Sequence, residues 1–88
     1  MYEIIVEPPA ERFIKQLKKE EQKILLDSIE QLALHPLKGK ELVGRLAGLR
    51  SLRLSHYRII YKIEPTQLII LVLRAGYRRD IYSKKIGN

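Results

Sequence analysis

The spacing of apolar residues along the first half of the chain predicts a strand followed by two helices. Tyr2 to Glu7 is short and rich in β-branched residues, which favours a strand that ends at Pro8-Pro9. Apolar residues then recur at helical spacing from Ala10 to Leu17 and again from Glu20 to Leu34, where Pro36 follows. The two helices are expected to form a hairpin.

A period of two replaces the helical period in the second half. Leu37 to Leu49 carries three glycines and is expected to be an irregular connection. Leu52 to Leu54 and Tyr57 to Ile63 alternate apolar with polar residues, and Ser55-His56 between them predicts a two-residue turn. Leu68 to Leu73 is apolar on both faces, as expected for a central or doubly covered strand. The sheet is predicted to be mainly antiparallel.

The end of the chain follows the apolar strand, where an exposed end of the sheet is expected. Gly76 permits a turn beyond Arg74, and the tail from Arg78 to Ile86 fits either a turn of helix or an edge strand. Residues 1–88 are therefore predicted to form one small domain.

Composition narrows the classes of function. The absence of cysteine excludes thiol catalysis and cysteine-type zinc sites, and with only two histidines we expect no metal or other cofactor. The run from Leu68 to Leu73 is far shorter than the roughly 20 residues that span a bilayer, and the N-terminus does not resemble a signal peptide. No membrane association is expected, and the predicted location is the cytoplasm.

The net charge of +7 lies entirely in the second half of the chain. Residues 1–49 carry eight basic and eight acidic side chains, whereas residues 50–88 carry nine basic and two acidic ones. Six of these nine are arginines, whose planar forks suit phosphate groups. A polyanion such as nucleic acid is the expected partner, although charge alone equally fits a basic surface that keeps the protein soluble.

Two groups of residues sharpen this expectation. With a turn at Ser55-His56, Arg53 faces Arg58, and like charges in that position destabilise a sheet by roughly 0.2–1 kcal/mol unless an anion lies between them. A different register, or side chains splayed into water, is the alternative. The segment from Arg74 to Tyr82 interleaves basic residues with tyrosine, which suits unstacked RNA bases better than duplex DNA. Tyr57 and Tyr61 are instead expected to fill the core, with their hydroxyls at its rim.

The segments Leu46 to Tyr61 and Gly76 to Tyr82, together with the order of elements, resemble the RelE/ParE toxin superfamily of type II toxin–antitoxin systems. The resemblance covers essentially the whole chain. It implies an α+β fold in which an N-terminal strand, a helical hairpin and a three-stranded meander form one twisted sheet with helices on one face. The spacing is closer to RelE, whose members are ribosome-dependent messenger-RNA endonucleases, than to ParE, whose members poison DNA gyrase.

By position, the resemblance assigns catalysis to Arg53, Arg58, Arg78 and Tyr82. These groups would assist a ribose 2′-hydroxyl in attacking the adjacent phosphorus without a metal. Ser51 and Arg53 stand where RelE has lysines, and because arginine hardly deprotonates, RNA binding is better supported than cleavage. His56 in the turn is an alternative acid–base group.

Further basic side chains are predicted to contact RNA: Arg50, Arg74, Arg79, Lys84 and Lys85. The implied partners are a cognate antitoxin, the ribosome and messenger RNA. A gyrase inhibitor, a non-cleaving RNA- or ribosome-binding module and a plain basic interaction module remain the alternatives.

Overall fold

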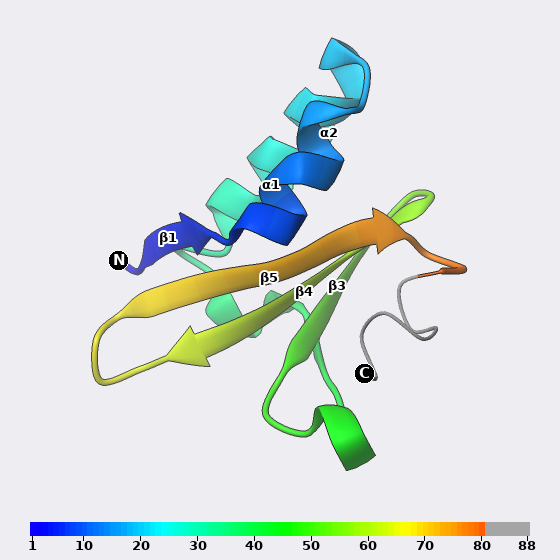
Figure 1. Cartoon of the computed structure of the whole chain (residues 1–88). Coiled ribbons are helices and arrows are strands. Elements are labelled where there is room, and N and C mark those ends of the chain that lie inside the picture. The colour runs from blue at the N-terminus through cyan, green and yellow to red at the C-terminus, as the bar shows by residue number, and fades with distance from the viewer. Residues whose placement is uncertain (81–88) are drawn as a thin grey trace.

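The computed structural model describes residues 1–80, which form a five-stranded sheet with two helices on one of its faces (Figure 1). This arrangement confirms the predicted α+β class. The elements in chain order are β1 (Glu3–Val6), α1 (Pro8–Lys15), α2 (Lys19–Gln31), the 3₁₀ turn η1 (Pro36–Lys38), β2 (Lys40–Glu41), the 3₁₀ turn η2 (Gly44–Leu46), β3 (Arg50–Leu54), β4 (Tyr57–Glu64) and β5 (Ile69–Tyr77).

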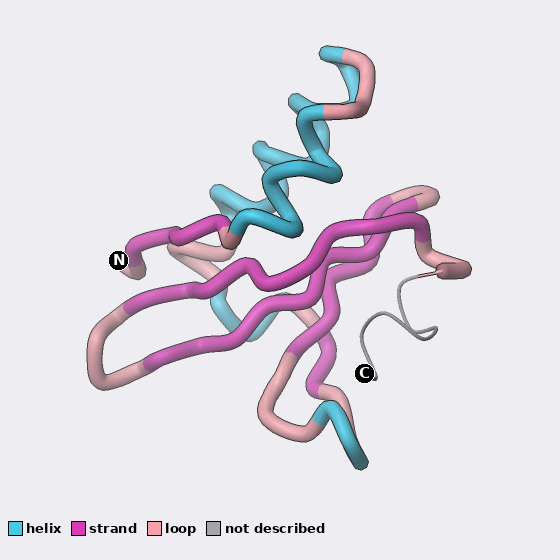
Figure 2. The backbone as a smooth tube through the Cα atoms, in the orientation of Figure 1, coloured by secondary structure: helices cyan, strands magenta, loops and turns pink. Residues whose placement is uncertain are grey.

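The strand order in the sheet is β1-β5-β4-β3-β2, and the twisted strands β3, β4 and β5 lie side by side (Figure 2). β1 pairs with β5 in parallel, whereas the other neighbours are antiparallel. The two-residue turn Ser55-His56 is confirmed, with Ser55 at φ 52°. Only its first position has a positive φ, as in the type II′ turns that suit hairpins.

β5 differs from the sequence prediction because it continues to Tyr77. Gly76 was predicted to sit in a turn, but it lies inside the strand, opposite Arg58. A bulge shifts the register, since Ile60 pairs with Arg74 while the next residue, Tyr61, pairs with Val72. The extra residue reverses which side chains face the helices beyond this point, so Arg74 and Gly76 lie on the helix-free face.

The core lies between the helices and one face of the sheet. Apolar side chains from both layers fill it: Ala10, Ile14, Leu25 and Ile29 from the helices, and Ile59, Tyr61, Ile70 and Val72 from the strands. Tyr57 and Tyr61 are buried as predicted, with 6% and 0% of their surface exposed. The segment with η2 lies on the opposite side of the sheet from α1 and α2 (Figure 1).

The Tyr61 hydroxyl does not lie at the rim of the core but fixes the connection between α2 and β3. Tyr61 Oη accepts the Gly39 backbone N–H at 2.9 Å and donates to the Pro36 carbonyl at 2.7 Å. A Cβ at Gly39 would lie 2.6 Å from this oxygen and 2.9 Å from the Ser51 carbonyl. Glycine is required at position 39 because of this close approach.

Candidate functional site

The predicted pairing of Arg53 with Arg58 is present in the hairpin of β3 and β4. Directly opposite residues have Cβ atoms about 4.5–5.5 Å apart, so two guanidinium groups share one patch of the helix-free face. Arg58 is half-buried, and its Nη1 donates to Ser51 Oγ at 3.0 Å. Ser51 is only 3% exposed, and this fixed acceptor orients the arginine. Arg53 is exposed.

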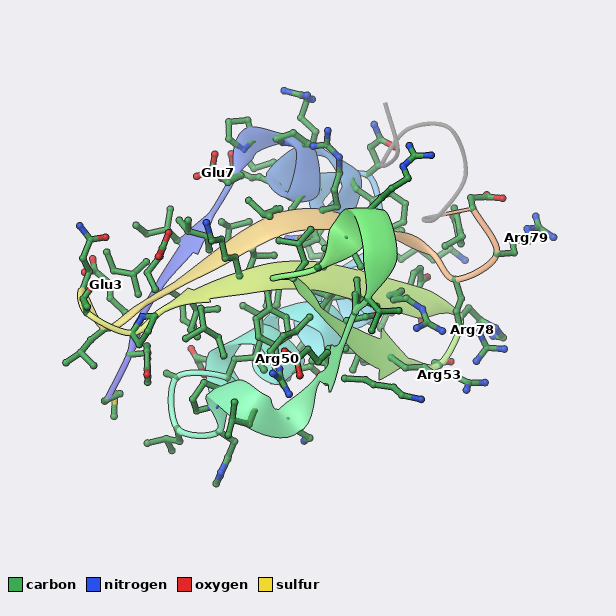
Figure 3. All side chains as sticks on the ribbon, turned by 90° about the horizontal axis from the view of Figure 1, so that it is seen from below. Glu3, Glu7, Arg50, Arg53, Arg78 and Arg79 are labelled. Carbon is green, nitrogen blue, oxygen red and sulfur yellow. The ribbon has the colours of Figure 1, made fainter. Side chains whose placement is uncertain are left out.

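Arg78 joins the pair from the end of β5. Its backbone N–H donates to the His56 carbonyl at 2.8 Å, and its Nη1 donates to the Ser55 carbonyl at 3.2 Å. Both bonds hold it against the turn that connects the strands of Arg53 and Arg58. Figure 3 shows Arg53 and Arg78 near each other at one end of the sheet. We name Arg53, Arg58 and Arg78 the arginine end.

Arg74 lies next to this cluster on the same face. Arg74 pairs with Ile60, which lies two positions along β4 from Arg58. Arg74 and Arg58 are therefore diagonal neighbours across the two strands. Arg74 is half-buried, and its Nη1 donates to the Leu73 carbonyl at 3.4 Å. Its placement depends on the β5 bulge, which strict alternation along the strand does not reveal.

Of the two other predicted RNA-binding arginines, Arg50 lies away from the arginine end and Arg79 lies beside it. Arg50 donates from Nε to the Gly39 carbonyl at 3.0 Å and from Nη2 to the Leu37 carbonyl at 3.4 Å, and Figure 3 places it away from Arg53 and Arg78. Its contacts give it a structural role in the connection before β3. Arg79 is exposed beside Arg78, with Nε 3.9 Å from Asp80 Oδ1.

The remaining predicted residues at the C-terminal end are Tyr82, Lys84 and Lys85, and they lie outside the described residues, as does most of the tail. Their assignment stays a prediction. His56 is exposed in the turn, and its ring lies 6.5 Å from that of Tyr57, between centroids.

Sequence reasoning missed two partners of the site. Ser51 was noted only as a departure from lysine, yet it is the acceptor that holds Arg58. Glu21 on α2 accepts a hydrogen bond of 2.7 Å from Tyr57 Oη at the start of β4. This bond, reinforced by burial, raises the pKa of Tyr57 to about 12, so the phenol keeps its proton at neutral pH.

The arginine end is chemically suited to hold a phosphate. Guanidinium groups donate paired hydrogen bonds to phosphate oxygens and neutralise charge that builds during transfer. Among residues 1–80, no group of three or more His, Asp or Glu is arranged to hold a metal ion. No helix in this part of the chain is long and apolar enough to cross a membrane.

Comparison with known proteins agrees with the fold. Residues 4–82 match the family model of the ParE toxin of the type II toxin–antitoxin system parDE. Toxin RelG of Mycobacterium tuberculosis is 39% identical over 54 residues, which span 60% of this chain and 62% of RelG.

Solved structures with the same fold include the M. tuberculosis RelBE2 toxin–antitoxin complex, at 28% identity and TM-score 0.81 over 88% of this chain and 98% of that one. The isolated E. coli RelE toxin superposes with TM-score 0.76 at 19% identity, over 98% of this chain and 96% of RelE. Because the family model spans nearly all of the sequence, the chain belongs to the RelE/ParE toxin superfamily of type II toxin–antitoxin systems.

Proposed function

We propose that this toxin is a ribosome-dependent messenger-RNA endonuclease whose phosphate-binding site is the arginine end. The observation that carries the proposal is that Arg53 of β3, Arg58 of β4 and Arg78, which follows β5, meet at one turn. Nothing in the packing of the core requires two facing arginines, because like charges in that position destabilise the hairpin. A scissile phosphate bound between the two side chains would act as a counter-charge to both.

In the proposed reaction the ribose 2′-oxygen bonds to the adjacent phosphorus and the bond from phosphorus to the 5′-oxygen breaks. The 2′-hydroxyl gives up its proton, and the departing 5′-oxygen takes one, which leaves a 2′,3′-cyclic phosphate and a 5′-hydroxyl. The three guanidinium groups hold the phosphate and stabilise its added negative charge. Proton transfer falls to Tyr82 by the family resemblance, with exposed His56 as the alternative.

The ribosome is proposed to supply the part of substrate orientation that a chain of 88 residues cannot supply itself. Messenger RNA held in the decoding site presents its ribose and phosphate in a fixed geometry, and such positioning contributes several kcal/mol to many reactions. The antitoxin is proposed to be an acidic protein that covers the arginine end and blocks access to RNA. The solved M. tuberculosis RelBE2 toxin–antitoxin complex, which has the same fold, supports an antitoxin as the partner.

The test is cleavage of a defined messenger RNA on programmed ribosomes, mapped by primer extension. Wild-type protein is expected to cut only when ribosomes are present. Arg58→Ala and Arg78→Ala are expected to abolish the cuts, whereas Arg12→Ala, which removes an exposed arginine on α1, keeps them. Thermal unfolding followed by circular dichroism verifies that each variant is folded.

Two results would contradict the proposal. Inhibition of gyrase supercoiling without RNA cuts would assign the protein to the ParE activity, whose family model it matches. Ribosome binding without cuts would leave a non-catalytic RNA-binding module.

A further inference from the structure

One row of side chains on the helix-facing side of the sheet lies directly behind the arginine end. Leu54, Tyr57 and Tyr77 occupy consecutive positions across β3, β4 and β5, since Leu54 pairs with Tyr57 and Tyr57 pairs with Tyr77. Each is a sequence neighbour of one clustered arginine: Arg53 precedes Leu54, Arg58 follows Tyr57 and Arg78 follows Tyr77. Because adjacent strand residues share a backbone, any shift of this row moves the arginines with it.

Both helices anchor this row through its aromatic members. Phe13 of α1 packs edge-on against Tyr77 and Tyr57, with ring centroids 5.3 Å and 6.1 Å apart. Tyr57 and Tyr77 lie against each other with centroids at 5.6 Å. Such aromatic contacts are directional, and they define the position of each ring.

The polar anchor is the hydrogen bond from Tyr57 Oη to Glu21 Oε1. It joins residues 36 positions apart, at a donor–acceptor distance of 2.7 Å, with Tyr57 only 6% exposed. Glu21 lies in the first turn of α2, where the helix dipole favours a carboxylate. The raised pKa of Tyr57 means that the donor is protonated throughout the physiological range. The proton that the bond requires is therefore present at physiological pH.

From this arrangement we infer that Tyr57, tethered by Glu21, is a positioning residue that sets the geometry of the arginine end without touching RNA. The effect is greatest on Arg78, which is bonded to the turn residues that immediately precede Tyr57. The catalytic consequence rests on the proposed nuclease function. Misplacement of a group by about 1 Å can lower a rate by about a hundredfold, so partial loosening is expected to cost about tenfold.

The first test measures cleavage at saturating and limiting concentrations of programmed ribosomes. Tyr57→Phe and Glu21→Ala are each expected to lower kcat about tenfold while KM changes less than twofold. The double variant is expected to match the single ones, because both remove the same bond. Glu21→Gln keeps an acceptor oxygen and is expected to retain most of kcat. Lys23→Ala, which removes an exposed ion pair with Asp27 on the same helix, is the control.

A second measurement decides the inference without any enzyme assay. Hydrogen exchange of the Arg78 amide reports its bond to His56, and Tyr57→Phe is expected to accelerate it about tenfold relative to Lys23→Ala. Unchanged exchange in folded Tyr57→Phe would overturn the inference, as would a wild-type kcat. If the wild-type protein makes no cuts, the nuclease proposal fails, and the exchange rate still decides whether Glu21 and Tyr57 hold the turn.

Discussion

Replacing Tyr61 with phenylalanine removes a single oxygen from the most buried aromatic side chain of the core. That oxygen accepts the Gly39 N–H and donates to the Pro36 carbonyl, so it connects the segment after α2 to the middle of β4. The ring remains and still fills its space, which means that the substitution tests the two hydrogen bonds and not the packing.

The size of the effect follows from what each partner loses. Gly39 is buried, and its N–H would lack an acceptor, which costs about 1–3 kcal/mol. The bond to the Pro36 carbonyl is only part-buried, so water can replace much of that contact. We therefore expect Tyr61→Phe to lower the free energy of unfolding by about 1–3 kcal/mol, out of the roughly 5–15 kcal/mol of a typical domain.

Urea unfolding monitored by far-ultraviolet circular dichroism measures this difference. The midpoint is expected to fall with an unchanged slope, and the melting temperature by about 4–8 °C for each kcal/mol lost. Tyr77→Phe is the matched control, because Tyr77 is 44% exposed and loses the same atom. An unfolding midpoint for Tyr61→Phe equal to that of the control would refute the reasoning.

Three further predictions use the same unfolding assay. Gly39→Ala is expected to destabilise the protein by about 1–3 kcal/mol through overpacking. The loss is expected to be smaller in a Tyr61→Phe background, where the contact with the Tyr61 hydroxyl is gone. Additive losses from the two substitutions would count against a clash between the new Cβ and this hydroxyl. The interactions that raise the pKa of Tyr57 stabilise the protein fully below about pH 10, and this contribution is lost as the pH rises toward 12. Wild type should therefore lose more stability over that interval than Tyr57→Phe. Parallel curves of unfolding free energy against pH for the two proteins would disprove the shift. Arg53→Ala should raise stability by roughly 0.2–1 kcal/mol at low salt, and a loss there would show that the facing arginines do not repel.

Much of the sheet could be predicted because the two-residue turn and the alternation of apolar and polar residues indicate the same hairpin. A two-residue turn at Ser55-His56 fixes which residues face each other, and the observed pairing of β3 with β4 is the register that this turn predicts. The bulge in β5 could not be predicted in this way. Leu68 to Leu73 is apolar on both faces, so its sequence gives no sign of where the alternation shifts by one residue.

The candidate site was likewise predictable only in part. The pairing of Arg53 with Arg58 followed from the turn. Arg50 and Arg53 are three positions apart, which already places their side chains on opposite faces of the strand, but the prediction that both bind RNA used only their charge. The bond between Glu21 and Tyr57 had no such signal. It depends on how the helical hairpin crosses the sheet, which is a tertiary property that no local pattern encodes.

In the proposed phosphate site, the two arginines whose repulsion lowers the stability of the hairpin are also the ones that would bind the anion. Arg58 gains a buried acceptor in Ser51, which offsets part of the cost of holding it beside Arg53. Under the proposed function, a bound phosphate would reduce the repulsion between these two side chains and form charge-assisted hydrogen bonds to both. The affinity for RNA is then expected to fall steeply with salt. An acidic antitoxin that occupies the same place would relieve the same repulsion, so inhibition and catalysis would draw on one electrostatic feature of the hairpin.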